Sequence, residues 1–197
     1  TVLESDLATM LVGVNDIREL YAQYPALSES EIVRQLTARG EAYAEQINRV
    51  ARAGAAVVVL TVPDLGRSPF GIAETAAHTD TDRGALLRTF TDAFNGGMRL
   101  KIINDGRLIG LEFADEELRR VLRFPGLYGF NEVESPACAD TAALPACTSE
   151  TLVTSAQAEI AGPTSIRPNS VLLNRRSVRS IRDRRAQTAG SRKFDSG

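Results

Sequence analysis

The sequence predicts an α/β fold built on a parallel β-sheet, and three observations support this prediction. Apolar runs that are typical of buried strands alternate with segments whose apolar residues recur at helical spacing. The run AAVVVLTV (55–62) is continuously apolar and rich in β-branched residues, as expected for a strand covered on both faces. Two predicted strands end close to candidate functional residues, Asn15 and Asp16 after the first strand and Pro63 and Asp64 after the second. Functional groups of such sheets lie beyond the carboxyl ends of the strands, so these pairs mark the predicted functional edge.

The first predicted strand covers residues 6–12, and the first predicted helix begins at Ser28. Ser28 and Glu31 have the spacing of a capping box, in which each side chain binds the backbone of the other residue. Gly54 ends this helix, because glycine favours the residue after a helix end. The apolar residues of the helix recur at helical spacing and are Ile32, Leu36, Tyr43, Ile47 and Val50.

The strand at 55–62 leads into the segment PDLGRSPFG, which is interpreted as a loop. A second helix is predicted to begin near Thr81 and to carry Leu87, Phe90 and Phe94 on one face.

The segment NDG (104–106) fits either a hairpin turn or a helix end that leads into the strand RLIGLEF. The established alternation of helices and strands favours the helix end. A short helix (115–123) and the loop FPGLYGF complete the order β-α-β-α-β-α. Right-handed crossovers between parallel strands then predict helices on both faces of the sheet.

The composition fits a soluble globular domain, with 43% hydrophobic and 24% charged residues. No run of about 18 apolar residues occurs, so no membrane span is predicted. The charges are unevenly distributed, because residues 163–197 hold nine basic and two acidic residues. From Thr151 onward the sequence shows no sustained apolar period. We therefore predict a folded domain at 1–155 and an Arg-rich, disordered tail at 156–197.

The basic tail raises the alternative of a nucleic-acid arm. Its single aromatic residue, Phe194, argues against this alternative, because single-strand binding relies on aromatic residues among the basic ones. A nucleic-acid partner is therefore not expected.

The two cysteines, Cys138 and Cys147, flank a segment whose Pro, Ala and Asp residues indicate a loop. No histidine or second cysteine pair offers metal-ligand spacing, so no metal site is predicted. A disulfide that closes the loop is favoured over two free thiols. Such a disulfide would place the protein outside the cytoplasm, in a secreted, periplasmic or cell-envelope location.

Three segments resemble conserved blocks of the GDSL (SGNH) family of serine esterases and lipases. GVND (13–16) resembles the third block, Gly-x-Asn-Asp, and VPDLGRSP (62–69) is similar to the loop after the next strand in the lipase-like branch. YGFNEVESPAC (128–138) resembles a late segment of secreted and autotransporter-borne members. The three segments occur in the family's order at the predicted strand ends, and the resemblance covers about residues 5–155.

The resemblance implies an incomplete three-layer α/β/α sandwich of the flavodoxin-like type that hydrolyses carboxylic esters without a cofactor. In this family a serine attacks the ester carbonyl, a histidine takes its proton and an aspartate orients the histidine. By the match, Asn15 is an oxyanion-hole donor, Gly13 allows a sharp backbone turn and Asp16 braces the loop. Pro63 and Asp64 are expected to contribute to the binding site. The alternative for Asn15 and Asp16 is that they only cap the following helical turn.

Two catalytic blocks of the family are missing from this sequence. Gly-Asp-Ser-Leu, which carries the nucleophile, and Asp-x-x-His-Pro, which carries the acid and base, do not occur. We expect the chain to be a fragment that begins after the nucleophile block. Neither Ser68, which lacks a nucleophile-elbow context, nor His78, the single histidine, is expected to be catalytic.

The tail suggests why the last block is absent. Codons permitted for AGPTSIRP (161–168), read in a shifted frame, spell Trp-Ala-Asp-Lys-His-Pro-Thr. This resembles the missing acid/base block, although it is one residue shorter between the aspartate and the histidine. We therefore expect a frameshift near residue 160, which would also account for the Arg-rich tail.

The sequence thus predicts a fragment of a secreted ester hydrolase that is inactive as this chain and whose substrate class is a small ester or a lipid. A non-catalytic module that binds a lipid or glycan on the same scaffold is the alternative. Removing strands from a sheet exposes apolar surface, so self-association through the exposed sheet is expected.

Overall fold

The computed structural model describes residues 6–103, 106–138 and 151–152. These residues belong to two compact units, and helix α4 (Arg83–Lys101) contributes to both. The first unit takes in the described residues up to Val62 together with the segment from Phe90 to Ala114, and the second takes in the other described residues. The predicted tail lies outside the described residues.

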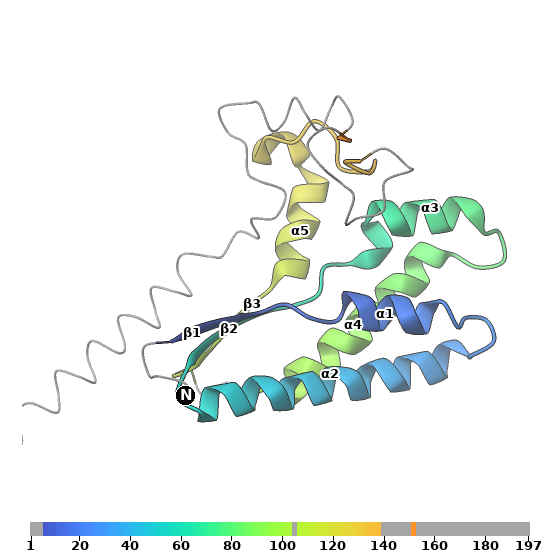
Figure 1. Ribbon diagram of the computed structural model, residues 1–197. Helices are drawn as coiled ribbons and strands as arrows, with labels where there is room; N and C mark the ends of the chain where they lie inside the picture. Colours follow the sequence, from blue (N-terminus) through green and yellow to red (C-terminus); the bar gives the residue numbers. More distant parts are fainter. Residues whose placement is uncertain (1–5, 104–105, 139–150, 153–197) are drawn as a thin grey trace, which may run out of the picture. The chain divides into compact units, whose positions relative to one another are not determined.

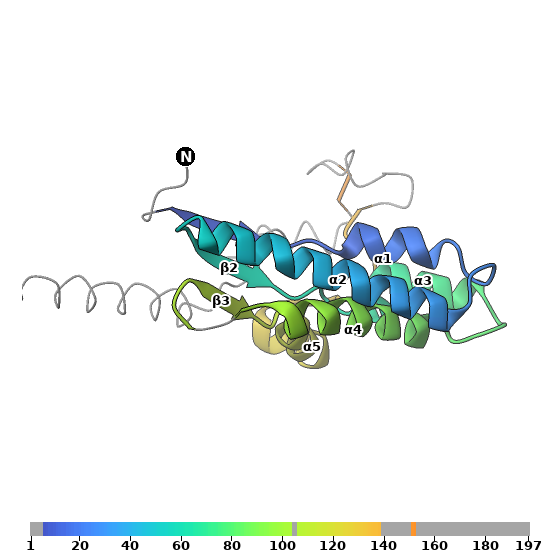
Figure 2. The same ribbon diagram turned by 90° about the horizontal axis from the view of Figure 1, so that it is seen from below.

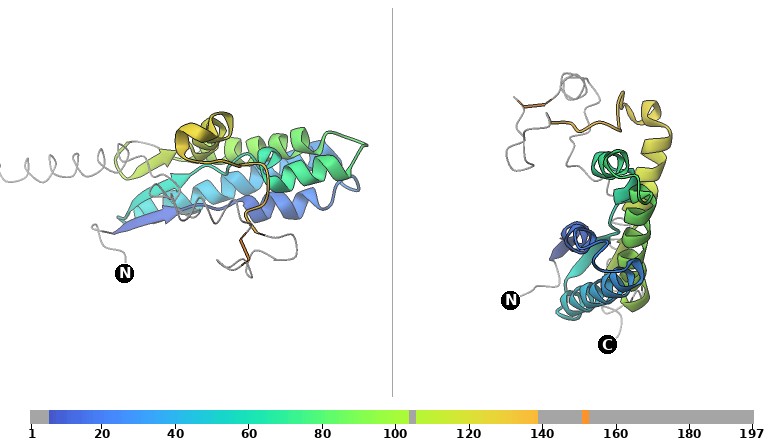
Figure 3. Two further views of the ribbon diagram at one scale, coloured as in Figure 1. Left: turned by 90° about the horizontal axis from the view of Figure 1, so that it is seen from above. Right: turned by 90° about the vertical axis from the view of Figure 1, so that its right-hand side faces the viewer.

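The first unit is built on a three-stranded parallel sheet in the order β1-β2-β3 (Figure 1). Its strands are β1 (Leu7–Met10), β2 (Ala56–Leu60) and β3 (Ile109–Glu112). The central strand β2 is buried along its whole length, while β1 and β3 form the two edges (Figure 3). The predicted mixed α/β fold with a parallel sheet is confirmed.

The pairing between the strands has a regular parallel register. Leu7 of β1 lies opposite Ala56, and Val57 of β2 lies opposite Ile109. The segment after residue 106 is therefore a parallel strand and not the second arm of a hairpin. The predicted strand is confirmed, and the preceding helix ends at Lys101, while Asn104 and Asp105 lie outside the described residues.

Two long helices connect the strands and pack against each other. Helix α2 (Glu29–Arg52) joins β1 to β2, and the part of α4 from Phe90 onward leads to β3. Right-handed crossovers between successive neighbouring strands place both connecting helices on the same face of the sheet. Figure 2 shows the two helices side by side. Within the described part of this unit, helices on both faces are not seen, so the three-layer sandwich stays a prediction.

A close contact between α2 and α4 depends on Gly40. A Cβ atom at this position would lie 2.1 Å from the carbonyl oxygen of Phe94. Three residues further along α2, the Tyr43 ring stacks on the Phe94 ring, with 6.1 Å between the ring centroids. Of the predicted apolar faces, Ile32, Leu36, Tyr43 and Ile47 of α2 and Phe90 and Phe94 of α4 are buried in the first unit, while Val50 is half-buried.

The start of α2 confirms half of the predicted capping box. The Ser28 hydroxyl accepts a hydrogen bond from the Glu31 backbone N–H at 3.3 Å. The Glu31 carboxylate instead accepts hydrogen bonds from Arg34 and Gln35, and those bonds lower its pKa to about 2. The boundary prediction was right because one side chain is enough to cap the helix.

Two helices were missed in the sequence. Helix α1 (Val14–Tyr21) begins directly after Gly13, which has no side chain that could cap the helix. The eight residues of α1 are too few to show a clear helical spacing of apolar residues. Helix α3 (Pro69–Ala77) lies partly inside the segment predicted to be a loop. Ser68 caps α3 and proline occupies its first turn, a standard start signal that the run of turn-forming residues obscured.

The second unit contains α3, the first turns of α4, and α5 (Ala114–Arg123) from Asp115 onward. It also contains two short 3₁₀ helices, η1 (Leu65–Arg67) and η2 (Pro125–Tyr128), where loops were predicted. None of the helices in the described ranges is long and apolar enough to cross a membrane.

Tyr43 supplies a stability prediction, because its side chain is 7% exposed and its hydroxyl has no hydrogen-bond partner among the described residues. Burial raises the pKa of Tyr43 to about 12. Above pH 10 the unfolded chain loses the phenolic proton while the folded chain keeps it. The free energy of unfolding should therefore fall by about 1.4 kcal/mol per pH unit between about pH 10 and 12 through this group alone.

Tyr43→Phe should remove that pH dependence and stabilise the protein by about 1 kcal/mol at pH 7, because it deletes a buried hydroxyl without a partner. Urea unfolding of both proteins at neutral and alkaline pH measures the difference. Equal alkaline slopes for the two proteins would show that the hydroxyl is not buried as described.

Candidate functional site

Gly13 connects β1 to α1 and can be replaced by no other residue without strain. Its φ angle of +128° lies in a region that residues with a side chain rarely adopt. A Cβ atom here would also lie 2.4 Å from a ring carbon of Phe94 and 2.7 Å from a methyl carbon of Val62. The backbone conformation and the close packing at this position both require glycine. The role that the resemblance implies for Gly13 stays a prediction.

The packing beneath Gly13 is held by Asn95, which the sequence analysis did not single out. The Asn95 side chain is 2% exposed, and its amide oxygen accepts a hydrogen bond from the Val62 backbone N–H at 2.8 Å. Its amide nitrogen donates to the Val62 carbonyl oxygen, also at 2.8 Å. One side chain thus satisfies both backbone groups of the residue that follows β2, and it fixes α4 to the carboxyl end of that strand.

Asn15 lies in the first turn of α1, directly beyond the carboxyl end of β1. Its side chain is exposed and makes no hydrogen bond to any other described residue. The first backbone N–H groups of a helix have no partner within the helix. Asn15 therefore presents a side-chain amide donor beside backbone donors at the same helix end, a combination that suits a developing negative charge.

Asp16 is held by Arg39 of α2. An Arg39 nitrogen lies 3.1 Å from the Asp16 carboxylate, and the same guanidinium contacts Glu19 at 3.0 and 3.2 Å. Hydrogen bonding to Arg39 lowers the pKa of Glu19. Asp16 thus forms an ion pair between α1 and α2, through an arginine that the sequence did not mark out. The loop-bracing role that the resemblance implies for Asp16 stays a prediction.

Pro63 and Asp64 belong to the second unit. Asp64 is 3% exposed, and its carboxylate accepts hydrogen bonds from the Gly66 backbone N–H and from the Arg88 side chain, both at 3.0 Å. The carboxylate is thus bound on both oxygens and almost entirely shielded from solvent. The contacts therefore favour an anchoring role for Asp64 in its loop, and Pro63 is half-buried beside it.

Ser68 and His78 lie at the two ends of α3. The Ser68 hydroxyl donates to the Leu65 carbonyl oxygen at 2.6 Å and accepts from the Gly71 N–H at 3.2 Å, so it serves as a helix cap. His78 is exposed and follows the last residue of α3, and one of its ring nitrogens lies 3.0 Å from the Glu74 carbonyl oxygen. The two side chains are therefore not arranged as a serine nucleophile and its histidine base.

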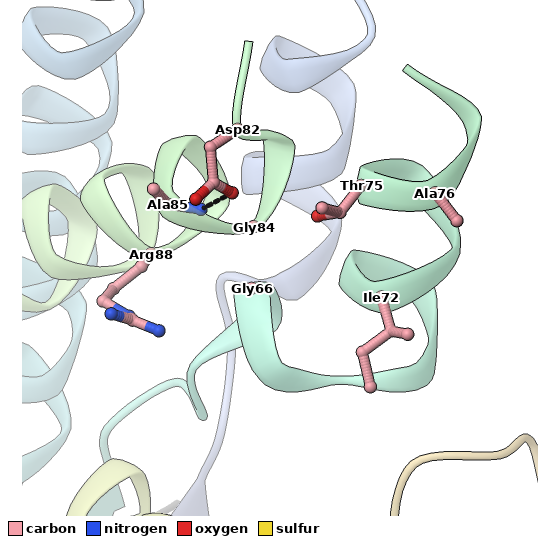
Figure 4. A pocket seen from close by; sticks show the side chains of 8 residues that line it. All are labelled: Gly66, Ile72, Thr75, Ala76, Asp82, Gly84, Ala85 and Arg88. Atoms are coloured by element: carbon pink, nitrogen blue, oxygen red, sulfur yellow. Dashed lines mark hydrogen bonds between the residues drawn. The ribbon is translucent and has the colours of Figure 1, made fainter. Parts of the chain in front are cut away.

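A hollow of about 400 Å³ lies between η1, α3 and the start of α4, within the second unit (Figure 4). Its polar groups are already engaged, because Asp82 accepts a hydrogen bond from the Ala85 N–H and Arg88 binds Asp64. The hollow contains no nucleophile paired with a base. Its lining consists of Gly66, Ile72, Thr75, Ala76, Asp82, Gly84, Ala85 and Arg88.

The predicted disulfide involves Cys147, which lies outside the described residues, so its pairing with Cys138 stays a prediction. Cys138 itself forms an isolated antiparallel bridge with Leu152. Among the side chains that the structure describes, no group of three or more His, Cys, Asp or Glu residues could hold a metal ion.

Comparison of the chain with known protein families, with curated proteins and with solved structures finds no match in any of the three. The resemblance to the GDSL family therefore rests on its sequence motifs, and membership of the family is taken up below as a proposal.

Replacing Asn95 tests how the site is supported. Asn95→Ala should lower the free energy of unfolding by about 3–5 kcal/mol, because two buried backbone groups lose their partners. Asn95→Asp keeps an acceptor for the Val62 N–H but places a carboxylate oxygen against the Val62 carbonyl. It should therefore be destabilising at pH 7 and partly restored at acidic pH, where a protonated carboxyl group can donate.

Urea unfolding at pH 7 and pH 5 measures both effects, with Gln46→Ala as the control. Gln46 is an exposed amide side chain on α2 and should change stability by less than about 0.5 kcal/mol. A loss for Asn95→Ala no larger than that of the control would contradict the described hydrogen bonds.

Proposed function

We propose that residues 5–155 form part of a GDSL-type carboxylic ester hydrolase in which Asn15 donates a hydrogen bond to the oxyanion. The observation that carries the proposal is the position of an exposed amide beyond a strand end, following a glycine with a positive φ angle. The sequence motif and the local geometry agree at this point. The substrate class is a small ester or a lipid ester.

The proposed mechanism assigns a specific task to each residue of this segment. Attack on the ester carbonyl converts its oxygen into an oxyanion, and the Asn15 side-chain amide would donate to that oxygen as the charge develops. Arg39 limits the movement of α1 through Asp16, and the packing under Gly13 limits the movement of the turn. A donor held in place in this way needs little reorganisation at the moment of reaction, and the absence of such reorganisation is the source of its catalytic effect.

The chain as it stands should not hydrolyse esters. The family's nucleophile and acid/base blocks do not occur in its sequence. Ser68 is engaged as a helix cap, and the single histidine, His78, contacts Glu74 at the far end of the same helix. Without a nucleophile to attack the ester carbonyl no oxyanion forms, so an oxyanion donor alone gives no hydrolysis.

An assay with p-nitrophenyl butyrate tests this expectation, and the proposal predicts no turnover that a serine-directed phosphonate can inhibit. The sequence of the gene upstream of the Thr1 codon tests the family assignment. The proposal predicts an in-frame Gly-Asp-Ser-Leu block there, and an Asp-His-Pro block in the shifted frame near residue 161.

A chain that includes the Gly-Asp-Ser-Leu block and the Asp-His-Pro block in one reading frame should hydrolyse p-nitrophenyl butyrate. A gene that lacks the nucleophile block, together with saturable binding of a lipid or glycan and no turnover, would replace the hydrolase proposal with the non-catalytic binding module.

A further inference from the structure

One asparagine of the sequence is followed directly by glycine, at Asn95–Gly96 in helix α4. The next residue, Gly97, has a packing role, because a Cβ atom there would lie 2.2 Å from the Thr37 carbonyl oxygen of α2. Gly96 has no such role among the described residues, since nothing beyond its own helix lies within 4 Å of its Cβ position. Glycine also lowers the stability of a helix relative to alanine. Neither packing nor helix propensity therefore accounts for Gly96.

An asparagine that precedes glycine is chemically labile, because no side chain hinders attack by the next backbone nitrogen. The Gly96 nitrogen bonds to the side-chain carbonyl carbon of Asn95, the C–N bond of the amide breaks, and ammonia leaves with the proton that the Gly96 nitrogen loses. Water then opens the resulting succinimide ring at either of its two carbonyl groups. The product is an aspartate, or an isoaspartate that adds a side-chain carbon to the backbone.

The fold holds both reacting groups apart. The Asn95 side chain is 2% exposed, and both polar atoms of its amide bind the Val62 backbone at 2.8 Å, so its carbonyl carbon is not free to approach Gly96. Gly96 lies inside α4, where each backbone N–H donates to the carbonyl four residues earlier. Ring formation needs both groups released, and this requires at least local unfolding of α4.

Either product removes the link between α4 and the end of β2. The aspartate product is chemically the Asn95→Asp variant, in which a carboxylate oxygen faces the Val62 carbonyl oxygen in place of a donor. The isoaspartate product lengthens the backbone and breaks the helical spacing of α4. The adjacent Phe94 packs under Gly13, so the damage extends to the turn between β1 and α1.

We propose that Asn95–Gly96 is a site of spontaneous deamidation, which the fold suppresses and which makes prolonged unfolding irreversible. The folded chain keeps the amide intact. A chain that stays unfolded converts it, and then lacks the side chain that fixes α4 to the sheet. Unfolding thus becomes irreversible through a chemical change in the unfolded state. This inference does not rest on the proposed function.

Incubation of the full chain in mildly alkaline buffer, with and without unfolding concentrations of guanidinium chloride, tests the proposal. Mass spectrometry of the proteolytic peptide that contains Asn95 measures its conversion to aspartate and isoaspartate. Conversion should be at least about 100-fold slower without denaturant, because only the open fraction of the chains reacts. Denaturant is also removed at intervals, and the fraction of chains that regain the helical circular dichroism signal should fall in step with the conversion.

Gly96→Ala is the matched control, because it keeps Asn95 and its added methyl group fits the open space at this position. The methyl group hinders the attack, so conversion in denaturant should be about tenfold slower than in the wild type. Refolding of this variant should be retained after the same incubation.

Three results would each overturn the proposal. Equal conversion of Asn95 with and without denaturant would show that the fold does not protect the amide. Converted chains that refold as fully as unconverted chains would show that the modification does not make unfolding irreversible. A loss of refolding in Gly96→Ala equal to that of the wild type would place the cause outside this site.

Discussion

The first unit depends on the pairing of one buried amide side chain with both backbone groups of Val62. Where β2 ends, the chain must leave the sheet while its N–H and C=O groups are still buried. Asn95 satisfies both of them at 2.8 Å. A buried polar pair of this kind is stabilising only when both partners are present, because either one alone would be left without a hydrogen bond. Helix α4 is therefore fixed to the sheet at one point along its length and in one orientation.

The arrangement of the candidate site follows from that fixed point. With Asn95 in place, the neighbouring Phe94 ring lies directly under Gly13, where a side chain of any size would collide with it. Gly13 in turn sets where α1 begins. The Arg39–Asp16 contact then limits the rotation of α1. The position of Asn15 is thus determined by residues that would never touch a substrate.

Much of the first unit could be predicted from sequence because its signals are local. The apolar run of β2, the Ser28 cap and the spacing of apolar residues in α2 are each visible within a few neighbouring residues. Helix α1 was missed because it is short and its cap is a glycine with no side chain to recognise. Helix α3 was missed because Pro69 and Gly71 resemble loop residues, although proline is well suited to the first turn of a helix.

The supports of the candidate site were not predictable in the same way. Gly13, Asn15 and Asp16 stand together in a motif, whereas Arg39 and Asn95 are distant from it in sequence and meet it only in the fold. Asn95 did carry a signal, because it adjoins Phe94 on the apolar face of a predicted helix, where a polar residue needs a buried partner. Its partners, the backbone N–H and C=O groups of Val62, could not be predicted, because almost every residue carries the same backbone groups. Ser68 binds the backbone of Leu65 and Gly71, and His78 contacts Glu74, so the two side chains do not reproduce the serine–histidine pair of the family's triad.

We propose that Asn15 stabilises an oxyanion, and one measurement tests this role. It is kcat and KM for p-nitrophenyl butyrate after Asn15→Ala, in a chain extended in frame by the nucleophile and acid/base blocks that the proposal predicts. The account predicts that kcat falls by about 10²–10³ while KM changes little, because the bond forms only as charge develops on the oxygen. The exposed amide variant Gln46→Ala should retain full activity. A kcat for Asn15→Ala within about twofold of the unmodified enzyme, or an effect confined to KM, would contradict the account.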